Sequence, residues 1–344
     1  MRPNVLVIVS HDTGTCVSPY GLRTVHTPAC ERLATDGIRF ARSFCTAPQC
    51  SPARASLFTG RYPHSNGVLG LANRDDDWHL HPDECHLARL LGDAGYHTGR
   101  IGIAHETTRP TQQALLRCAI DLPEASSIHD APAALDRVLA TCPAGHPWYA
   151  QIGCFETHRD FLRGEVEPDT TLGVSIPPPT PDTPESLADY AAFQGAIRSL
   201  DRGIGAVLEL LSARGALDDT IVVLTTDHGP AMPWAKGSCF DRGLATMCIM
   251  RYPAWGSGRI CDHLVSGVDL LPTLLQACAI PVPPKPLHGV SLLPWLDGSD
   301  TATAARDHIW AEKTFHDCYD PMRCVREDRW KYIRYFEHSS LHRV

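Results

Sequence analysis

Several features that define other classes of protein are missing from this chain of 344 residues. There is no excess of basic residues, because 31 Lys and Arg against 39 Asp and Glu give a formal net charge of −8. A nucleic-acid-binding protein needs a concentrated basic face, and no apolar run approaches the ~20 residues that a membrane-spanning helix requires. We therefore expect neither nucleic acid nor a membrane among the partners of this protein.

Cysteine is too scarce for a disulfide scaffold and is spaced wrongly for a structural zinc site. The 14 cysteines make up about 4% of the chain, below the ~8–10% of small disulfide-rich proteins, and no CxxC pair occurs. Residues Met1–Asn4 lead directly into an apolar run, without the longer apolar core and cleavage site of a signal peptide. Many thiols without an export signal predict a cytoplasmic protein.

What the chain does contain is an alternation of strand and helix patterns, which is typical of an open α/β sheet. Three apolar runs, Val5–Ser10, Trp148–Cys154 and Thr220–Thr225, predict strands that are buried on both faces. Further helices are expected over Thr27–Gly37 (capped by Thr27), Ser51–Thr59, Leu87–Ala94, Ala131–Ala140 and Leu187–Arg214, and further strands over Ile38–Phe44 and Tyr96–Ile103.

The pattern changes near Pro286. Beyond it, Trp310–Lys313, Met322–Arg326 and Trp330–Phe336 alternate apolar and polar residues, which predicts antiparallel strands. We expect a large α/β domain over residues 1–285, with a mostly parallel central sheet flanked by helices, and a small antiparallel C-terminal subdomain over residues 286–344.

Acidic and imidazole side chains follow two of the buried strands directly. They are His11 and Asp12 after the first strand, and Asp227 and His228 after the third. Because ligands of such sheets bind at the carboxyl ends of strands, these residues predict a site for a divalent cation such as Ca²⁺ or Mg²⁺. Imidazole is a poor ligand for Ca²⁺ and a better one for transition metals, so either His11 is a weak or outer ligand or the site prefers a different metal. The alternative is a turn with a solvated acid.

The most specific stretch is Cys50–Arg61 (CSPARASLFTGR). A cysteine at a helix N-terminus beside Arg54 is close to the positive end of the helix dipole, and the same groups suit a sulfate or phosphate. The stretch resembles the signature of the type I sulfatases, C-x-P-x-R followed by TGR, whose cysteine is oxidised to Cα-formylglycine. A cysteine-phosphatase loop is disfavoured, because it needs an arginine where Ser56 stands.

The resemblance runs in order from Asn4 to about Phe336 and is nearest to heparan N-sulfatase-like and bacterial arylsulfatase-like members. It implies the alkaline-phosphatase-like α/β fold, a Ca²⁺ ion held together with the formylglycine at position 50, and a formylglycine-generating enzyme as the maturation partner. It also implies a sulfated small molecule or glycan as the substrate.

Three more segments resemble the family pattern: GYHTGRIGIAH, FETHRDF and AKGSCFDRG. They contain His105, His158 and Lys236, respectively. The resemblance implies that Arg54, His158 and Lys236 bind the sulfate, that His158 or Lys236 protonates the leaving group, and that His105 helps to release the product. Arg242 is a weaker candidate for the pocket, as is the more distant Arg251.

The chain departs from the family pattern at two positions. The family usually has two adjacent acids where this chain has His11-Asp12, and a lysine that contacts the sulfate where this chain has Ile103. The second change removes a positive charge from the anion pocket. We expect another cation to compensate, such as protonated His11 or Arg100, although alternation along a strand points Arg100 away from its odd-numbered neighbours.

Two C-terminal segments resemble the family more weakly. Asp269–Thr273 (DLLPT) resembles a VDLxPT turn, and we expect it to be scaffold, with Pro272 opening a helix that is capped near Asp269. Tyr319–Arg323 (YDPMR) resembles a segment of heparan-N-sulfatase-like members that is expected to reach over the pocket and select the sugar.

Together these features predict a sulfatase that hydrolyses a sulfate ester or sulfamate, through a formylglycine hydrate and a divalent cation. Three alternatives stay open. They are a phosphate or phosphonate ester hydrolase on the same scaffold, a non-catalytic relative that binds sulfated glycans, and an enzyme that uses an unmodified Cys50 thiol.

Overall fold

The computed structural model describes residues 2–72, 78–107, 115–164, 166–299 and 306–337. Its centre is an eight-stranded sheet with the order β10-β2-β9-β7-β1-β6-β4-β5. All neighbouring strands from β7 to β5 are parallel, whereas β9 is antiparallel to both of its neighbours. The strands of this sheet are β1 (Asn4–Ser10), β2 (Ile38–Phe40), β4 (His97–Gly102), β5 (Ile120–Leu122), β6 (Trp148–Gly153), β7 (Thr220–Thr226), β9 (Cys248–Arg251) and β10 (Arg259–Cys261).

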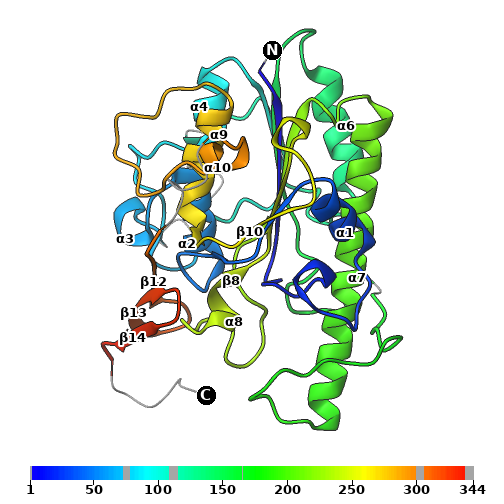
Figure 1. Ribbon diagram of the computed structural model, residues 1–344, viewed down its shortest axis with the longest axis vertical. Helices are drawn as coiled ribbons and strands as arrows, with labels where there is room; N and C mark the ends of the chain where they lie inside the picture. The colour runs from blue at the N-terminus through cyan, green and yellow to red at the C-terminus, as the bar shows by residue number, and fades with distance from the viewer. Residues whose placement is uncertain (1, 73–77, 108–114, 165, 300–305, 338–344) are drawn as a thin grey trace.

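Helices cover both faces of this sheet (Figure 1). One face packs against α1, α6 and the long α7, and the other packs against α2, α4, α9 and α10. The helices are α1 (Pro28–Thr35), α2 (Cys50–Thr59), α3 (Pro63–Asn66), α4 (Leu87–Asp93), α6 (Ala131–Thr141), α7 (Pro184–Ala213), α8 (Asp241–Leu244), α9 (Leu270–Ala277) and α10 (Leu293–Leu296), with short 3₁₀ turns at Ser18–Tyr20, Pro253–Trp255 and Gly267–Asp269.

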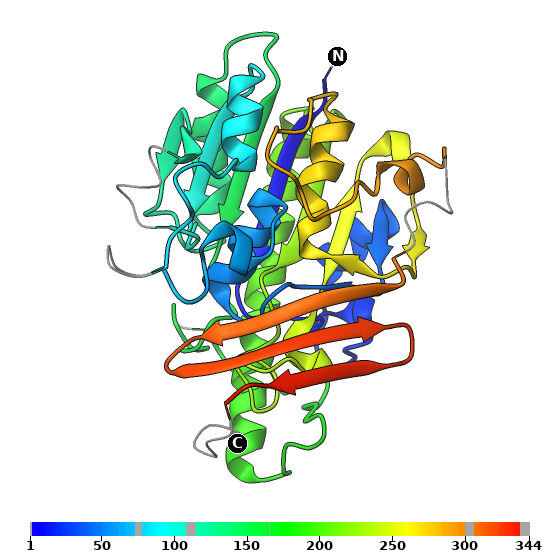
Figure 2. The same ribbon diagram turned by 90° about the vertical axis from the view of Figure 1, so that its left-hand side faces the viewer.

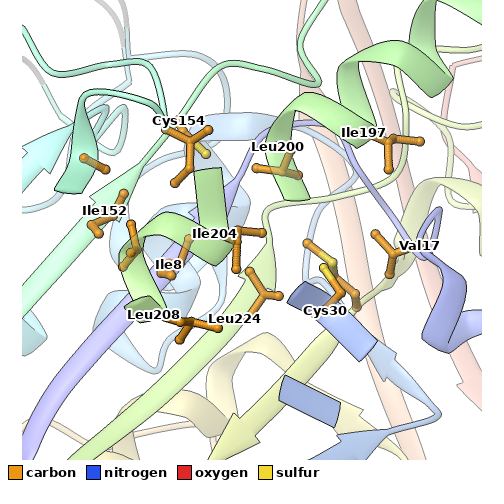
Figure 3. Close-up of a cluster of buried hydrophobic side chains, with 14 of the residues drawn as sticks. Ile8, Val17, Cys30, Ile152, Cys154, Ile197, Leu200, Ile204, Leu208 and Leu224 are labelled. Carbon is orange, nitrogen blue, oxygen red and sulfur yellow. The ribbon is translucent and has the colours of Figure 1, made fainter. Parts of the chain in front are cut away.

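The central strand β1 joins the two hydrophobic cores. Its side chains alternate between the faces of the sheet, so Ile8 meets Leu200 and Ile204 of α7 (Figure 3) while Val7 lies in the core under α2 and α9. All four residues are fully buried. The apolar, β-branched run at the start of the chain therefore forms a strand buried on both faces, as expected.

Two small sheets complete the fold. One has the order β11-β3-β8, and the other is the C-terminal sheet β12-β13-β14, whose strands are antiparallel (Figure 2). The Glu312 amide donates to the Thr46 carbonyl at 2.8 Å, which joins the C-terminal sheet to the segment before Cys50. The strands are β3 (Ser43–Phe44), β8 (Ala245–Thr246), β11 (Val265–Ser266), β12 (His308–Phe315), β13 (Tyr319–Glu327) and β14 (Lys331–Tyr335).

The predicted fold class is confirmed: a large, mostly parallel sheet flanked by helices, followed by a small antiparallel sheet. In the expected C-terminal subdomain, residues 300–305 and 338–344 lie outside the described part of the chain. In the described part, no helix combines the length and apolar character needed to cross a membrane. All fourteen cysteines are described, and each is a free thiol.

Two local predictions are wrong. Ile38–Phe44 is not one strand, because the chain leaves the main sheet after Phe40 and enters the small sheet as β3. Thr27 precedes α1, but its hydroxyl contacts Ser18 rather than capping the helix. The helix expected around Pro272 is α9, which begins at Leu270 with Asp269 as its N-cap residue. The Asp269 carboxylate makes no hydrogen bond to α9; it accepts from the Ser266 amide and pairs with Arg306.

Candidate active site

The predicted site residues lie at the ends of four adjacent parallel strands. In the order β7-β1-β6-β4, these strands lead to Asp227 and His228, to Asp12, to His158 and to His105. Because carboxyl ends of parallel strands meet at one edge of a sheet, residues more than 200 positions apart in the chain become neighbours. The structure thus brings the predicted residues together.

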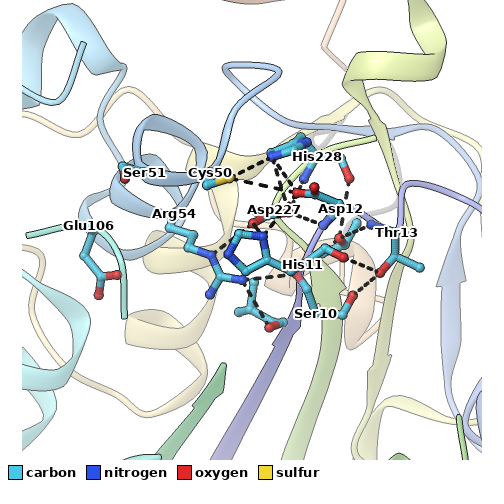
Figure 4. A network of polar contacts seen from close by, with 12 residues as sticks. Ser10, His11, Asp12, Thr13, Cys50, Ser51, Arg54, Glu106, Asp227 and His228 are labelled. Carbon is cyan, nitrogen blue, oxygen red and sulfur yellow. Dashed lines mark hydrogen bonds and ion pairs between the residues drawn. The ribbon is translucent and has the colours of Figure 1, made fainter. Parts of the chain in front are cut away.

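Asp227 is the best-connected group of the site (Figure 4). Its Oδ1 accepts hydrogen bonds from the Asp12 amide at 2.9 Å and the His228 amide at 2.8 Å. Its Oδ2 accepts from Arg54 Nε at 3.1 Å and lies 3.2 Å from His11 Nδ1. Burial alone would raise the pKa of Asp227, but the neighbouring His11, His228 and Arg54 hold it well below its usual value. Asp227 is therefore a fixed carboxylate.

Cys50 is the first residue of α2 and faces His228. Its Sγ lies 3.3 Å from His228 Nε2 and 3.9 Å from Asp12 Oδ1. His228 Nδ1 lies 2.8 Å from the Gly229 carbonyl, so Nδ1 carries the proton and Nε2 presents a lone pair toward Cys50.

Burial raises the pKa of the Cys50 thiol, and the nearby cation Lys236 only partly opposes this. The helix dipole and Arg54 suggest the opposite direction, but desolvation of a fully buried sulfur outweighs them. An unmodified Cys50 is a protonated thiol at neutral pH, which argues against the thiol-enzyme alternative.

The donor atoms fit a divalent cation. Ligand atoms of Asp12, Cys50, Asp227 and His228 all lie within 4.8 Å of one another, and Asp12 and Cys50 form a second such group with His11 and His158. Carboxylates hold their charge here, because the pKa of Asp12 is also well below its usual value: burial opposes ionisation, but His228, His11 and Lys236 outweigh it. Two carboxylates and imidazole nitrogens are a common donor set for metals.

Lys236 places a permanent cation at the site. Its Nζ lies 2.6 Å from Asp12 Oδ2. Burial would lower the pKa of Lys236, but Cys50 and Asp12 raise it above its usual value. This ammonium is therefore available to an anionic substrate that enters beside residue 50.

Three histidines form an aromatic cluster beside this cation. The ring of His11 lies 4.9 Å from that of His158 and 5.7 Å from that of His105, and it stacks on Phe155 at 5.2 Å. Burial lowers the pKa of all three histidines, that of His105 to about 3. His11 is therefore neutral at physiological pH and adds no positive charge.

We expected protonated His11 or Arg100 to replace the positive charge that is missing at Ile103. In the described structure neither side chain does so. His11 is neutral, and Arg100 is engaged elsewhere, because its Nε donates to Asp121 Oδ1 at 2.7 Å. Arg251 also lies away from the site, beside Asp218 before the first residue of β7. Arg242 donates to the Tyr190 hydroxyl at 2.7 Å.

Arg54 is fully buried beneath the site, where its guanidinium holds the ends of β1 and β7 in place. Besides Asp227, it donates through Nη2 to the carbonyls of Ser10 at 3.2 Å and Val9 at 3.4 Å. The geometry gives Arg54 a role in orienting Asp227, in addition to the sulfate contact that the family resemblance implies.

Sequence reasoning missed a buried hydrogen-bonded pair, Glu106 and His86, behind the site. Glu106 directly follows His105 and is fully buried. Its Oε1 lies 3.2 Å from His86 Nε2 and accepts from Gln151 Nε2 at 3.4 Å. The sequence signal was an acid beside a site histidine, but its partner is 20 residues away and only the fold shows it.

Carboxylates, imidazoles and a buried cysteine lie at the carboxyl edge of a parallel sheet, beside a fixed ammonium. This arrangement is that of a hydrolase of anionic esters with a possible metal site. A family model described as Sulfatase matches residues 3–280, and one described as N-sulphoglucosamine sulphohydrolase, C-terminal, matches residues 233–343. The chain belongs to the sulfatase family and is a sulfuric ester or N-sulfate hydrolase; a divalent metal and formylglycine are general features of that family.

Individual relatives agree with this assignment. N-sulphoglucosamine sulphohydrolase of Homo sapiens is 28% identical over 374 residues, which cover 96% of this chain and 73% of the relative. The structure of a 2-O GAG sulfatase has a TM-score of 0.80 at 23% identity, covering 98% of this chain and 83% of that one. A phosphonate monoester hydrolase from Silicibacter pomeroyi has a TM-score of 0.79 at 20% identity, covering 97% and 87%. The two structures show the shared fold.

Proposed function

We propose that this sulfatase acts on a sulfated sugar, and that residue 50 carries the reaction as formylglycine. The observation that carries the proposal is the position of Cys50. It begins α2 within a sulfatase signature, and its Sγ lies 3.3 Å from His228 Nε2 and 3.9 Å from Asp12 Oδ1. As a thiol it is protonated and buried, so conversion to formylglycine gives this position a chemical role. The human relative, named for N-sulphoglucosamine, supports a sugar substrate.

Each residue of the site has a separate role in the proposed reaction. A divalent cation held by Asp12, Asp227 and His228 would polarise the sulfate and lower the pKa of an attacking hydroxyl. Hydrated formylglycine at position 50 would supply that hydroxyl and a second one for product release. Lys236 binds a sulfuryl oxygen and, as the charged group, donates the proton to the leaving atom. Neutral His105 accepts a proton during release. His158 hydrogen-bonds the sulfate at the half-buried side of the site.

The identity of the metal is a separate proposal. The family resemblance implies Ca²⁺, and the carboxylates of Asp12 and Asp227 are ligands that Ca²⁺ prefers. His228, and His11 through its Nδ1, add imidazoles, which suit transition metals better. We therefore propose a site that holds Ca²⁺ with lower selectivity over Mn²⁺ or Zn²⁺ than an all-oxygen site has. Metal analysis of protein dialysed against equimolar mixtures of these ions measures this selectivity.

Maturation and turnover are tested in one experiment. The protein is coexpressed with a formylglycine-generating enzyme, which we propose as its maturation partner, and the peptide around Cys50 is examined by mass spectrometry. We expect the aldehyde, together with release of inorganic sulfate from sulfated monosaccharides. Cys50→Ala should abolish release and keep the fold, whereas Cys261→Ala, a matched buried cysteine on β10, should remain active. An active enzyme whose Cys50 stays a thiol contradicts the proposal.

A phosphate or phosphonate ester hydrolase is the second candidate. The fold is shared with a phosphonate monoester hydrolase, and an anion pocket built from Lys236 and neutral histidines does not by itself separate sulfate from phosphate. A comparison of kcat/KM on an aryl sulfate and on the matching aryl phosphonate distinguishes the two functions. Binding of a sulfated sugar without turnover, in protein with confirmed formylglycine, would instead indicate a non-catalytic relative.

A further inference from the structure

The loop between β7 and α8 carries Lys236 and lies at the carboxyl end of the main sheet, between the C-terminal sheet and α7 (Figure 1). Both sides of this loop are tied to segments that hold site residues. Arg159, which follows His158, donates through Nη2 to the Ala231 carbonyl at 2.9 Å. The Gly237 amide donates to the Pro48 carbonyl at 2.8 Å, two residues before Cys50. The part of the loop between these anchors therefore borders the site.

Two aromatic side chains of this loop are left uncovered. Trp234 is 41% exposed and Phe240 is 38% exposed, and their ring centroids lie 5.7 Å apart with the planes tilted by 54°. Large aromatic surfaces in water have a hydration cost that a bound apolar face removes. Ligand sites commonly combine such aromatic walls with a few placed polar groups.

The backbone fixes the place of Trp234. Its φ is 61°, a left-handed conformation that is uncommon for a bulky residue and that clusters at functional sites. Its carbonyl accepts from Ser238 Oγ at 3.2 Å, and the Lys236 amide donates to the Pro230 carbonyl at 3.0 Å. The indole is thus held at the surface by the same turn that holds Lys236 at the site.

A charged pair from the C-terminal sheet lies close to the backbone of this loop at Gly237. A Cβ added to Gly237 would lie 3.8 Å from Lys313 Nζ, and that ammonium pairs with Asp320 at 2.9 Å. The pair comes from β12 and β13 of the C-terminal sheet, and both side chains are mostly buried. An ammonium and a carboxylate next to each other donate to and accept from sugar hydroxyls.

We propose that Trp234, backed by Phe240, is the stacking surface for the sugar ring that carries the scissile sulfate, with Lys313 and Asp320 facing its hydroxyls. This inference rests on the proposed function. Lys236 contacts the fully buried Asp12, and a carboxylate repels a sulfate ester, so a sulfate bound at Lys236 would have its sugar on the side away from Asp12. Trp234 lies only two positions before Lys236 in the same loop. A pyranose ring has an apolar C–H face that covers an indole, and its hydroxyls point outward from the ring edge.

The test is a comparison of kinetic constants on glucosamine N-sulfate and glucosamine 6-O-sulfate, with inorganic sulfate as a product inhibitor. Trp234→Ala should raise KM for the better sugar about tenfold and change kcat less than twofold. Inorganic sulfate has no ring, so its inhibition constant should stay within twofold. Trp234→Phe should keep KM within about threefold of the wild type. Trp310→Ala, which removes an exposed tryptophan from β12, is the matched control and should change neither constant.

An unchanged KM in Trp234→Ala, in an active wild-type background, overturns this inference and leaves the proposed function intact. An equal weakening of inorganic sulfate also overturns it, because the substitution would then act on the anion pocket. A wild-type enzyme that releases no sulfate from any sugar contradicts the proposed function and, with it, the inference.

Discussion

Two regions meet at the same end of this molecule, and they are built in opposite ways. At the edge of the main sheet, Asp12, Arg54 and Asp227 are fully buried and have several polar partners each. On the C-terminal sheet, Trp310 and Trp330 are exposed. Buried charges cost several kcal/mol when one partner is lost, whereas exposed groups contribute little. The buried polar contacts therefore contribute to the stability of the fold as well as to the site, whereas exposed side chains such as Trp310 and Trp330 contribute little to stability.

The largest effect is expected from removing the central carboxylate. Asp227→Ala leaves Arg54 with an unpaired buried charge, and the free energy of unfolding should fall by roughly 3–5 kcal/mol. Metal content and sulfate release should both be lost. Asp241→Ala removes a half-exposed carboxylate with two cationic partners and is the control, with less than about 1 kcal/mol lost. Denaturant unfolding, metal analysis and sulfate release measure the three effects, and full metal occupancy in an active Asp227→Ala variant would refute the site.

A second expected effect is a dependence of protein stability on pH, which arises from the buried histidines of the site. Burial lowers the pKa of His11, His105 and His228 below 6.5, so below pH 6.5 the unfolded chain binds more protons than the folded one. Stability of metal-free protein should therefore fall as the pH drops from 6.5, by up to about 1.4 kcal/mol per pH unit for each of these histidines. Urea unfolding of EDTA-treated protein at pH 7.5 and 5.5 measures this. A stability that is the same at both values contradicts the assignment of neutral histidines.

A smaller effect concerns the position where the family has a lysine. In the described part of the chain, His11 is neutral and Arg100 pairs with Asp121, so neither of the two expected cations replaces the family's lysine. Ile103→Lys should raise kcat/KM on an aryl sulfate about tenfold, which corresponds to ~1.4 kcal/mol of transition-state stabilisation. Ile103→Met, of similar length but uncharged, should leave it unchanged. A fall in Ile103→Lys, with Ile103→Met active, means that another cation already fills the pocket.

The smallest effect is expected on the C-terminal sheet. Trp330 is 75% exposed, so Trp330→Ala should change the free energy of unfolding by less than about 0.5 kcal/mol. Its kcat/KM should stay within twofold of the wild type. A change of several kcal/mol would show that this sheet is as tightly coupled to the fold as the buried site is, and it would remove the contrast between the two regions.

The sequence was informative where a pattern is local. The apolar run of β1 predicted a strand buried on both faces, and polar residues after strands predicted where side chains would meet. The sequence did not predict the short elements correctly. β2 and β3 are only three and two residues long, and the strands with which they pair determine that they belong to different sheets. The hydroxyl of Thr27 forms a hydrogen bond with Ser18 instead of capping the helix.

The sequence also did not predict electrostatic effects between residues that are far apart in the chain. The position of Cys50 at a helix N-terminus suggested a lowered pKa, but the depth at which the fold buries the sulfur reverses the direction. The pairing of Glu106 with His86, and the neutral state of His11, likewise depend on what surrounds each side chain. The charge states of such residues depend on the packed interior around them, and that interior is not visible in the sequence.

The way Asp227 is held also has a consequence for how such a site changes over generations. Its Oδ1 is fixed by the main-chain amides of residues 12 and 228, and every residue except proline supplies such an N–H donor. The side chain at position 228 can therefore be exchanged without loosening these two hydrogen bonds. Position 11 differs, because the His11 ring itself lies 3.2 Å from Asp227 Oδ2. A lineage can therefore change the donor atom at position 228 by a single replacement while the main-chain hold on Asp227 is inherited unchanged.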